Sequence, residues 1–85
     1  IPFGSLVELG IIKPGTTIFD NKKKISAKIM ADGSIKHAQT EGSIHKVAAT
    51  ILGAESCNGW TYWHYNLDGA VVPIDHLRQK LISKN

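Results

Sequence analysis

The clearest periodic pattern in the chain lies between residues 43 and 53. Apolar side chains recur from Ile44 to Leu52 at the spacing i, i+3, i+4, i+7 and i+8, which aligns them along one face of a helix. Ser43 precedes the pattern as a suitable N-cap, and Gly53 follows it as the expected left-handed terminator. The pattern therefore predicts a helix that begins after Ser43 and packs one face against a core.

Shorter patterns before this helix predict an antiparallel meander. Residues 16–19 are β-prone after a Pro-Gly turn, and residues 25–31 alternate between apolar and polar side chains. Asp32-Gly33 predicts a type I′ hairpin turn, in which both central residues need positive φ, with residues 34–37 as the returning strand. Near the N-terminus, Ser5–Glu8 fits a capping box, so we expect a short helix that ends at Gly10.

The second half of the chain predicts a second hairpin and a last helix. The aromatic segment 60–65 is expected to be a strand after an Asn58-Gly59 turn, and Asp68-Gly69 is expected to return the chain into residues 70–72. Pro73 suits the start of the last helix, whose apolar positions are Ile74, Leu77, Leu81 and Ile82. The sum is one α+β domain over residues 1–85, a small antiparallel sheet of hairpins with about three short helices packed on it.

Composition limits the function classes. A chain of 85 residues with 42% hydrophobic and 20% charged residues is typical of a soluble domain with one small core. The single cysteine, Cys57, excludes an internal disulfide framework, and no segment approaches the ~20 apolar residues of a membrane span. Because the chain opens Ile1-Pro2-Phe3 without an initiator Met, we interpret it as a piece of a longer protein.

Enzyme and metal signatures are absent from the sequence. It contains no nucleophile elbow, phosphate-binding loop, dinucleotide fingerprint or zinc motif. Cys57 with His45 or His64 would form a dyad only if the fold brought them together, so we interpret Cys57 as a small buried hydrophobic residue. No metal site is expected from the scattered histidines, which are His37, His45, His64 and His76.

The charge pattern leaves two interpretations open. The net charge is +3, and Lys22, Lys23 and Lys24 stand together between two expected strands. They form either a solvated hairpin tip or a phosphate clamp. In the same way, His45 and Lys46 place cations in the first turn of the helix after Ser43, where they oppose the helix dipole. Either an anion compensates there, or Ser43 is simply a cap.

The aromatic segment also has two interpretations. On a strand, Trp60 and Tyr62 face one side while Trp63 and Tyr65 face the other. If the second pair supplies the core, the first pair is left toward solvent, where it suits stacking on nucleobases; the alternative is a strand buried on both faces. Asn58 is then either a turn former or a reader of a base edge.

Arg78 is the only arginine in the chain, and it lies on the last helix between Leu77 and Leu81. One interpretation is a solvated or ion-paired residue. The other uses its planar fork for phosphate or guanine recognition.

Taken together, the motifs Gly42-Ser43-Ile44-His45, Ser56–Trp63 and Pro73-Ile74-Asp75-x-Leu77-Arg78 resemble a known pattern. The chain is similar to the C-terminal domain of the cell-cycle-regulated DNA adenine methyltransferases (the CcrM family) of alphaproteobacteria. That domain type is named after restriction enzymes and adenine methylases. The resemblance runs over nearly the whole chain and implies a DNA-binding domain without catalysis of its own, in an N6-adenine methyltransferase that acts at GANTC.

The resemblance also implies site residues and partners. The family's DNA-contacting serine, asparagine, tryptophan and arginine match Ser43, Asn58, Trp60 and Arg78. It implies duplex DNA with opened bases as partner, a homodimeric parent enzyme, the bacterial cytoplasm with the nucleoid as location, and S-adenosylmethionine bound in a catalytic domain outside this chain, with no cofactor here. The complete set of expected DNA-binding residues is Lys22, Lys23, Lys24, Ser43, His45, Lys46, Asn58, Trp60 and Arg78.

A rival hypothesis from another class is a protein-interaction or dimerisation module. Trp60, Tyr62 and Trp63 would then be the hot spots of a subunit interface. The two hypotheses differ in their salt dependence, since phosphate binding weakens steeply with ionic strength and an aromatic interface does not.

Overall fold

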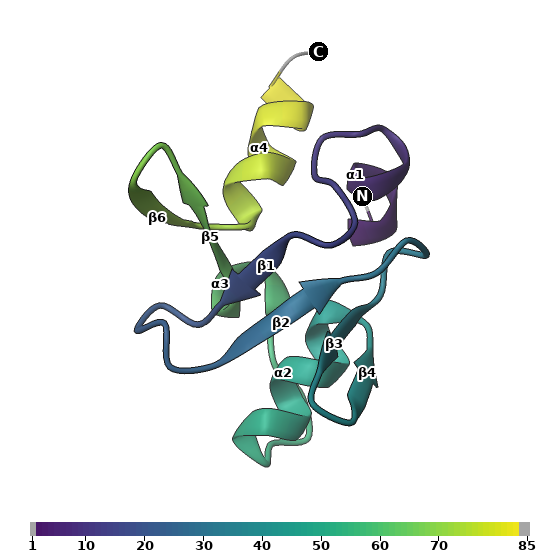
Figure 1. The fold of residues 1–85 in the computed structure, drawn as a ribbon, viewed down its shortest axis with the longest axis vertical. Coiled ribbons are helices and arrows are strands. Elements are labelled where there is room, and N and C mark those ends of the chain that lie inside the picture. Colours follow the sequence, from purple (N-terminus) through teal and green to yellow (C-terminus); the bar gives the residue numbers. More distant parts are fainter. Residues whose placement is uncertain (1, 84–85) are drawn as a thin grey trace.

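The computed structural model describes residues 2–83 and shows an α+β fold built on one antiparallel sheet (Figure 1). The strand order is β4-β3-β2-β1-β5-β6, so the expected meander forms one half of the sheet and the second hairpin forms the other half. In chain order the elements are α1 (Phe3–Glu8), β1 (Thr17–Phe19), β2 (Ser26–Ile29), β3 (Ile35–His37), β4 (Thr40–Gly42), α2 (Ile44–Leu52), α3 (Gly59–Tyr62), β5 (His64–Leu67), β6 (Ala70–Pro73) and α4 (Asp75–Ser83).

The core lies between one face of the sheet and the helices. Alternate residues of the inner strands are buried, and they pack in one cluster with the apolar face of α2 and with Trp63. Since β1 pairs with β5 only at Phe19 and His64, packing in this shared core joins the two halves more than strand pairing does. The fully buried side chains of the cluster include Leu6, Ile18, Ile29, Ile35, Ile44, Val47, Trp63 and Ile74.

Helix α2 confirms the strongest sequence pattern. The Ser43 hydroxyl accepts a hydrogen bond from the backbone N–H of Lys46 at 3.0 Å, and Gly53 ends the helix with a φ of 68°. The last apolar position of the pattern differs from the expectation. Leu52 was expected to face the core, but it is exposed at the end of the helix.

The predicted capping box near the N-terminus is wrong. Helix α1 begins at Phe3 with Pro2 as its N-cap residue, so Ser5 lies inside the helix and caps nothing. Pro2 suits the cap position because its φ is fixed and its missing N–H is not needed there. Burial of Phe3 in the core then starts the helix earlier than the polar pattern indicates.

The Asp32-Gly33 hairpin is confirmed, but its turn type is not. Of the two turn residues, only Gly33 has a positive φ. The N–H of Met30 donates to the carbonyl of Ser34 at 2.8 Å, which gives a three-residue loop rather than a type I′ turn. The Asp32 carboxylate instead accepts hydrogen bonds from the hydroxyl and the N–H of Ser34, which lowers the pKa of Asp32. At Asp68-Gly69, both residues have the positive φ values that a type I′ turn requires.

Other differences concern elements that the sequence pattern did not show. Strand β4 was not predicted, and it returns along β3 through a turn in which Ala38, not a glycine, has a positive φ. Pro73 ends strand β6 instead of starting the last helix. The segment 60–62 belongs to helix α3, and the strand starts only at His64.

Helix α3 forms because it packs directly on the first turn of α2. A Cβ atom on Gly59 would lie 2.6 Å from the carbonyl carbon and 2.7 Å from the carbonyl oxygen of Ile44. The indole N–H of Trp63 donates to that same carbonyl at 3.0 Å, in the buried core. Backbone contact and a buried hydrogen bond together override the β-propensity of the aromatic segment.

Replacing Gly59 with Ala should lower the free energy of unfolding by about 1–3 kcal/mol, because the added methyl group overlaps the Ile44 backbone. Gly4→Ala is the matched control. Its Cβ would meet nothing closer than 3.9 Å, and alanine favours helix α1, so this variant should be neutral or more stable by up to about 1 kcal/mol. Urea unfolding of both variants measures the difference; equal stability would contradict the packing of α3 on α2.

Tyr65 is buried, and its hydroxyl has no hydrogen-bond partner among the described residues. We expect Tyr65→Phe to be neutral or to raise the free energy of unfolding by up to about 1 kcal/mol at neutral pH, because it removes an unsatisfied polar group. Burial also raises the pKa of Tyr65 above 10.0, so the unfolded chain ionises first as the pH rises. The free energy of unfolding is therefore unaffected by Tyr65 ionisation below pH 10 and decreases above it. The Phe variant, which cannot ionise at this position, should lose less stability at high pH. Urea unfolding near neutral pH and at about pH 11 checks both parts.

Candidate nucleic-acid interface

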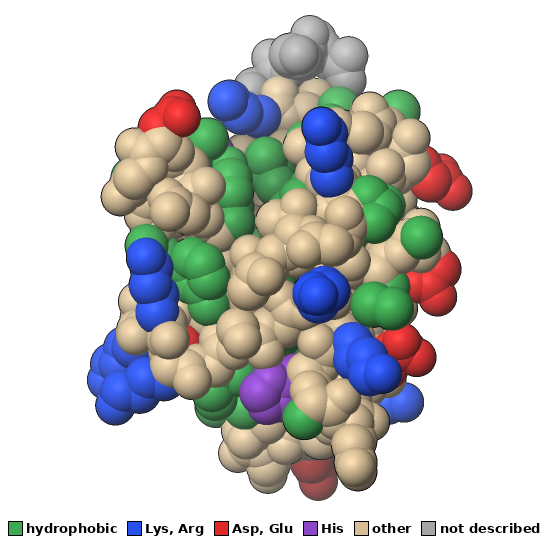
Figure 2. All heavy atoms as spheres, in the orientation of Figure 1, with side chains coloured by type: hydrophobic (Ala, Val, Ile, Leu, Met, Phe, Trp, Pro, Cys, Tyr) green, Lys and Arg blue, Asp and Glu red, His purple; other side chains and the backbone are tan. Residues whose placement is uncertain are grey.

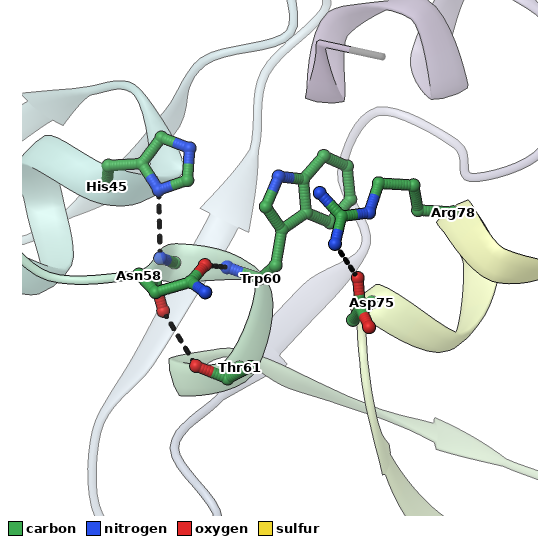
Figure 3. A network of polar contacts seen from close by, with 7 residues as sticks. His45, Asn58, Trp60, Thr61, Asp75 and Arg78 are labelled. Carbon is green, nitrogen blue, oxygen red and sulfur yellow. Dashed lines mark hydrogen bonds and ion pairs between the residues drawn. The ribbon is translucent and has the colours of Figure 1, made fainter.

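Three segments that are far apart in the sequence meet on one surface of the domain. They are the start of α2, the start of α3 and the first turn of α4 (Figure 3). A continuous series of contacts runs across them, from His45 through Gly59 and Asn58 to Trp60, and then to Arg78 and Asp75. We name the surface formed by Ser43, His45, Asn58, Trp60, Asp75 and Arg78 the motif surface.

His45 joins the start of α2 to the start of α3. Its Nδ1 accepts a hydrogen bond from the backbone N–H of Gly59 at 2.9 Å (Figure 3). A ring that accepts at Nδ1 carries its proton on Nε2 when it is neutral, so Nε2 is a hydrogen-bond donor. The side chain is exposed, which makes this donor accessible to a ligand.

Asn58 is the N-cap of α3 and not the turn former expected from Asn-Gly. Its Oδ1 accepts from the N–H of Trp60 at 3.0 Å, and its backbone carbonyl accepts from the Thr61 hydroxyl at 3.1 Å. The Nδ2 group has no partner among the described residues, and the side chain is exposed. Asn58 can therefore donate to a ligand while its oxygen holds the helix.

Of the two interpretations of the aromatic segment, the one that leaves Trp60 toward solvent is wrong. Because α3 is a helix, the two-residue alternation of a strand does not apply, and Trp60 is buried with only 6% of its surface exposed. Its ring contacts Phe3 edge to face, with centroids 5.9 Å apart. Tyr62 is half-buried against Trp63. Trp63 and Tyr65 are in the core, as expected.

Arg78 is held on two sides. Its guanidinium carbon lies 4.6 Å from the centroid of the Trp60 ring, and one of its terminal nitrogens lies 2.5 Å from the carboxylate of Asp75. The Nε of Arg78 is shielded from solvent and has no partner in the described chain. The stacking and the ion pair fix the plane of the guanidinium before any ligand arrives.

The start of α2 lies between two hollows. The larger, of about 400 Å³, is lined by residues of α2 and of the segment 54–57, including Lys46 and Cys57. The smaller, of about 240 Å³, lies toward α1 and Gly33. Ser43 and His45 line both hollows, so the first turn of α2, with its unpaired N–H groups and positive dipole end, forms a ridge between them.

The lysine loop lies outside this series of contacts. Lys22, Lys23 and Lys24 are exposed between β1 and β2, as expected, and the Asp20 carboxylate shapes the loop by accepting from the N–H groups of Lys24 and Ile25. The ammonium group of Lys23 lies 5.1 Å from the centroid of the Phe19 ring. Burial, and then the charge of Asp20 before this loop, raise the pKa of Tyr62 in α3.

The structure gives no catalytic arrangement to Cys57. The thiol is half-buried and makes no hydrogen bond to either histidine among the described residues, and Nδ1 of His64 lies 3.0 Å from the carbonyl of Tyr62. Within residues 2–83 there is no group of three or more His, Cys, Asp or Glu side chains that could hold a metal ion. None of the helices in this range is long and apolar enough to cross a membrane.

Comparisons with known proteins identify the family. The model of the restriction enzyme adenine methylase associated domain matches residues 1–85, and the chain belongs to this family. It is also similar to the Type II methyltransferase M.HinfI of Haemophilus influenzae, with 30% identity over 78 residues. That match covers 92% of this chain and 22% of the relative, so the chain spans about a fifth of the length of the methyltransferase it resembles.

Sequence reasoning missed Asp75 as part of the motif surface and Gly59 as a residue that supports it. Asp75 stands three residues before Arg78, a spacing that places both on one face of a helix and indicates an ion pair. Gly59 carries no side-chain signal, since its importance comes from contact with Ile44 in the folded chain.

The Asp75–Arg78 pair should show a favourable coupling of about 0.5 kcal/mol in a double-mutant cycle. Urea unfolding of Asp75→Asn, Arg78→Gln and the double variant measures it. Arg78→Lys is the control, because it keeps the charge but loses the planar face against Trp60. Strictly additive effects would show that the pair does not fix the guanidinium.

Proposed function

We propose that this chain is the DNA-binding domain of an adenine DNA methyltransferase and that the motif surface contacts the DNA. The observation that supports the proposal most directly is the meeting of His45, Asn58 and Arg78 on one surface (Figure 3), although they come from separate motifs. Membership of the adenine methylase associated family is the second support.

The proposed contacts use the groups that the fold leaves accessible. Arg78 offers an oriented guanidinium to a phosphate or a guanine edge. Asn58 and His45 offer N–H donors to bases or sugar oxygens. Lys46 and the first N–H groups of α2 suit phosphates. Lys22, Lys23 and Lys24 lie outside the motif surface and suit phosphates farther along the DNA.

Trp60 has a different role in this proposal from the one expected at first. A ring with 6% exposure cannot stack broadly on a base. It supports the guanidinium of Arg78 and thus positions a DNA-contacting group. The same burial weakens the rival dimerisation hypothesis, because Trp60 and Trp63 belong to the core and are not available as hot spots of an interface.

The finer features come from the resemblance to the cell-cycle-regulated methyltransferases and are part of the proposal. They are recognition of GANTC, opening of the duplex, a homodimeric parent enzyme located at the bacterial nucleoid, and the absence of catalysis from this domain. S-adenosylmethionine would bind elsewhere in that parent.

The direct test is a titration of the 85-residue chain against labelled duplexes with and without GANTC, and against single strands, at two salt concentrations. We expect binding that weakens with salt. Arg78→Gln should lose about tenfold in affinity, the size of one charge-assisted hydrogen bond. Asn58→Asp should also weaken binding, because it keeps a capping oxygen but replaces the donor with a negative charge.

Further variants distinguish the loss of a DNA contact from a general effect of substitution on the domain. Gln79→Ala, at an exposed neighbour of Arg78, should bind as the unchanged chain does. Lys23→Gln should lower the salt slope by about one unit at all sequences. A preference for GANTC would place part of the recognition in this domain. If the folded chain binds no DNA even at low salt, the proposed function is wrong.

A further inference from the structure

Over β2 and β3, the sheet has a second face that no helix within residues 2–83 covers, and lysines occupy it (Figure 1). In β2 and β3 the buried residues alternate with exposed ones, which include Lys28 and Lys36. These two lysines are register partners on adjacent strands, so their side chains project side by side. Figure 2 shows Lys and Arg side chains spread over this face, while most acidic side chains lie along one edge of the view.

The position of these lysines is not explained by protection of a sheet edge. Lysines often guard edge strands against pairing with another chain, but β2 and β3 are interior strands in the order β4-β3-β2-β1-β5-β6. Like charges directly opposite each other on a sheet repel. A neutral polar pair would keep the face soluble without that repulsion, so the lysine pair indicates an anionic partner.

One carboxylate of the described residues lies directly opposite the lysine pair on this face. Glu41 is the register partner of Lys36, and Thr17 is the register partner of Lys28. Neither lysine forms an ion pair within residues 2–83, and nor do the lysines of the loop 22–24 between β1 and β2. Asp20, the nearest carboxylate in that loop, is engaged by backbone N–H groups. We name the surface formed by Lys28 and Lys36 the lysine face.

We propose that the lysine face binds the phosphate backbone of a second DNA segment, so that one domain holds two segments. This inference rests on the proposed DNA-binding function of the motif surface. Helices α2 and α3, which carry most of the motif surface, pack on the opposite side of the sheet (Figure 1). A straight duplex lying against one side therefore cannot lie against the other. Lysines that are evenly exposed, without an oriented arginine or amide, suit phosphates and not base edges.

The test uses Lys28→Gln with Lys36→Gln, compared with Lys80→Glu, which changes the net charge by the same amount on helix α4. For the binding of a second duplex to the chain that already holds a first one, we expect the double variant to have a salt slope that is smaller by about two units, one for each phosphate contact. The ratio of affinities for duplexes with and without GANTC should not change. Lys80→Glu should keep the slope of the unchanged chain.

A second measurement asks directly for two DNA segments. A bead-bound duplex is incubated with the chain and with a labelled free duplex, and retention of the label is measured. We expect retention by the unchanged chain and by Lys80→Glu, and its loss in the Lys28→Gln, Lys36→Gln variant. Retention by that double variant would show bridging by another route, such as dimerisation, and would overturn the proposal.

The outcomes distinguish this inference from the function on which it rests. If the unchanged chain binds no DNA, both fail. If it binds but the double variant keeps the same salt slope, only the lysine face is excluded, and an acidic protein surface becomes its partner. A smaller salt slope for the first duplex, without any retention of the second, would place the lysines on the same DNA segment and also overturn the proposal.

Discussion

The close contact between Gly59 and the backbone of Ile44 is the constraint on which the motif surface depends. Only a residue without a Cβ atom lets the start of α3 approach the first turn of α2 this closely. The buried hydrogen bond from Trp63 to the Ile44 carbonyl fixes the other end of α3 on the same backbone. The two helix starts are therefore held as one unit, and residues from separate motifs become neighbours.

Within this unit, several polar side chains use one group to hold the structure and leave another accessible. His45 uses Nδ1 to hold Gly59 and leaves Nε2 accessible, while Asn58 uses Oδ1 as a cap and leaves Nδ2 accessible. Arg78 uses one nitrogen for Asp75 and its flat side for Trp60. Groups held in this way lose little conformational freedom when a ligand binds, which favours affinity for a given number of contacts.

The sequence allowed prediction of elements whose signals are local. Helix α2 and its caps, the hairpins and the lysine loop follow from periodicity and from turn residues. Helix α3 could not be predicted, because its aromatic residues favour a strand and only contact with Ile44 reverses that preference. The same error affected the candidate site, because the burial of Trp60 depends on a helix that the pattern did not show. Strand β4 has too few apolar positions to produce a pattern at all.

The hydrogen bond that His45 accepts also explains in part why the first turn of α2 tolerates both His45 and Lys46. Two positive charges there would oppose the helix dipole, yet the hydrogen bond that His45 accepts at Nδ1 requires a ring that is not protonated at that atom. The unfavourable charge is thus reduced to Lys46, whose side chain lies back toward Gly42 and is exposed. An exposed lysine at this position opposes the dipole by only about 0.3–1 kcal/mol. The fold tolerates this small unfavourable term, and a phosphate near the same helix start would turn it into attraction.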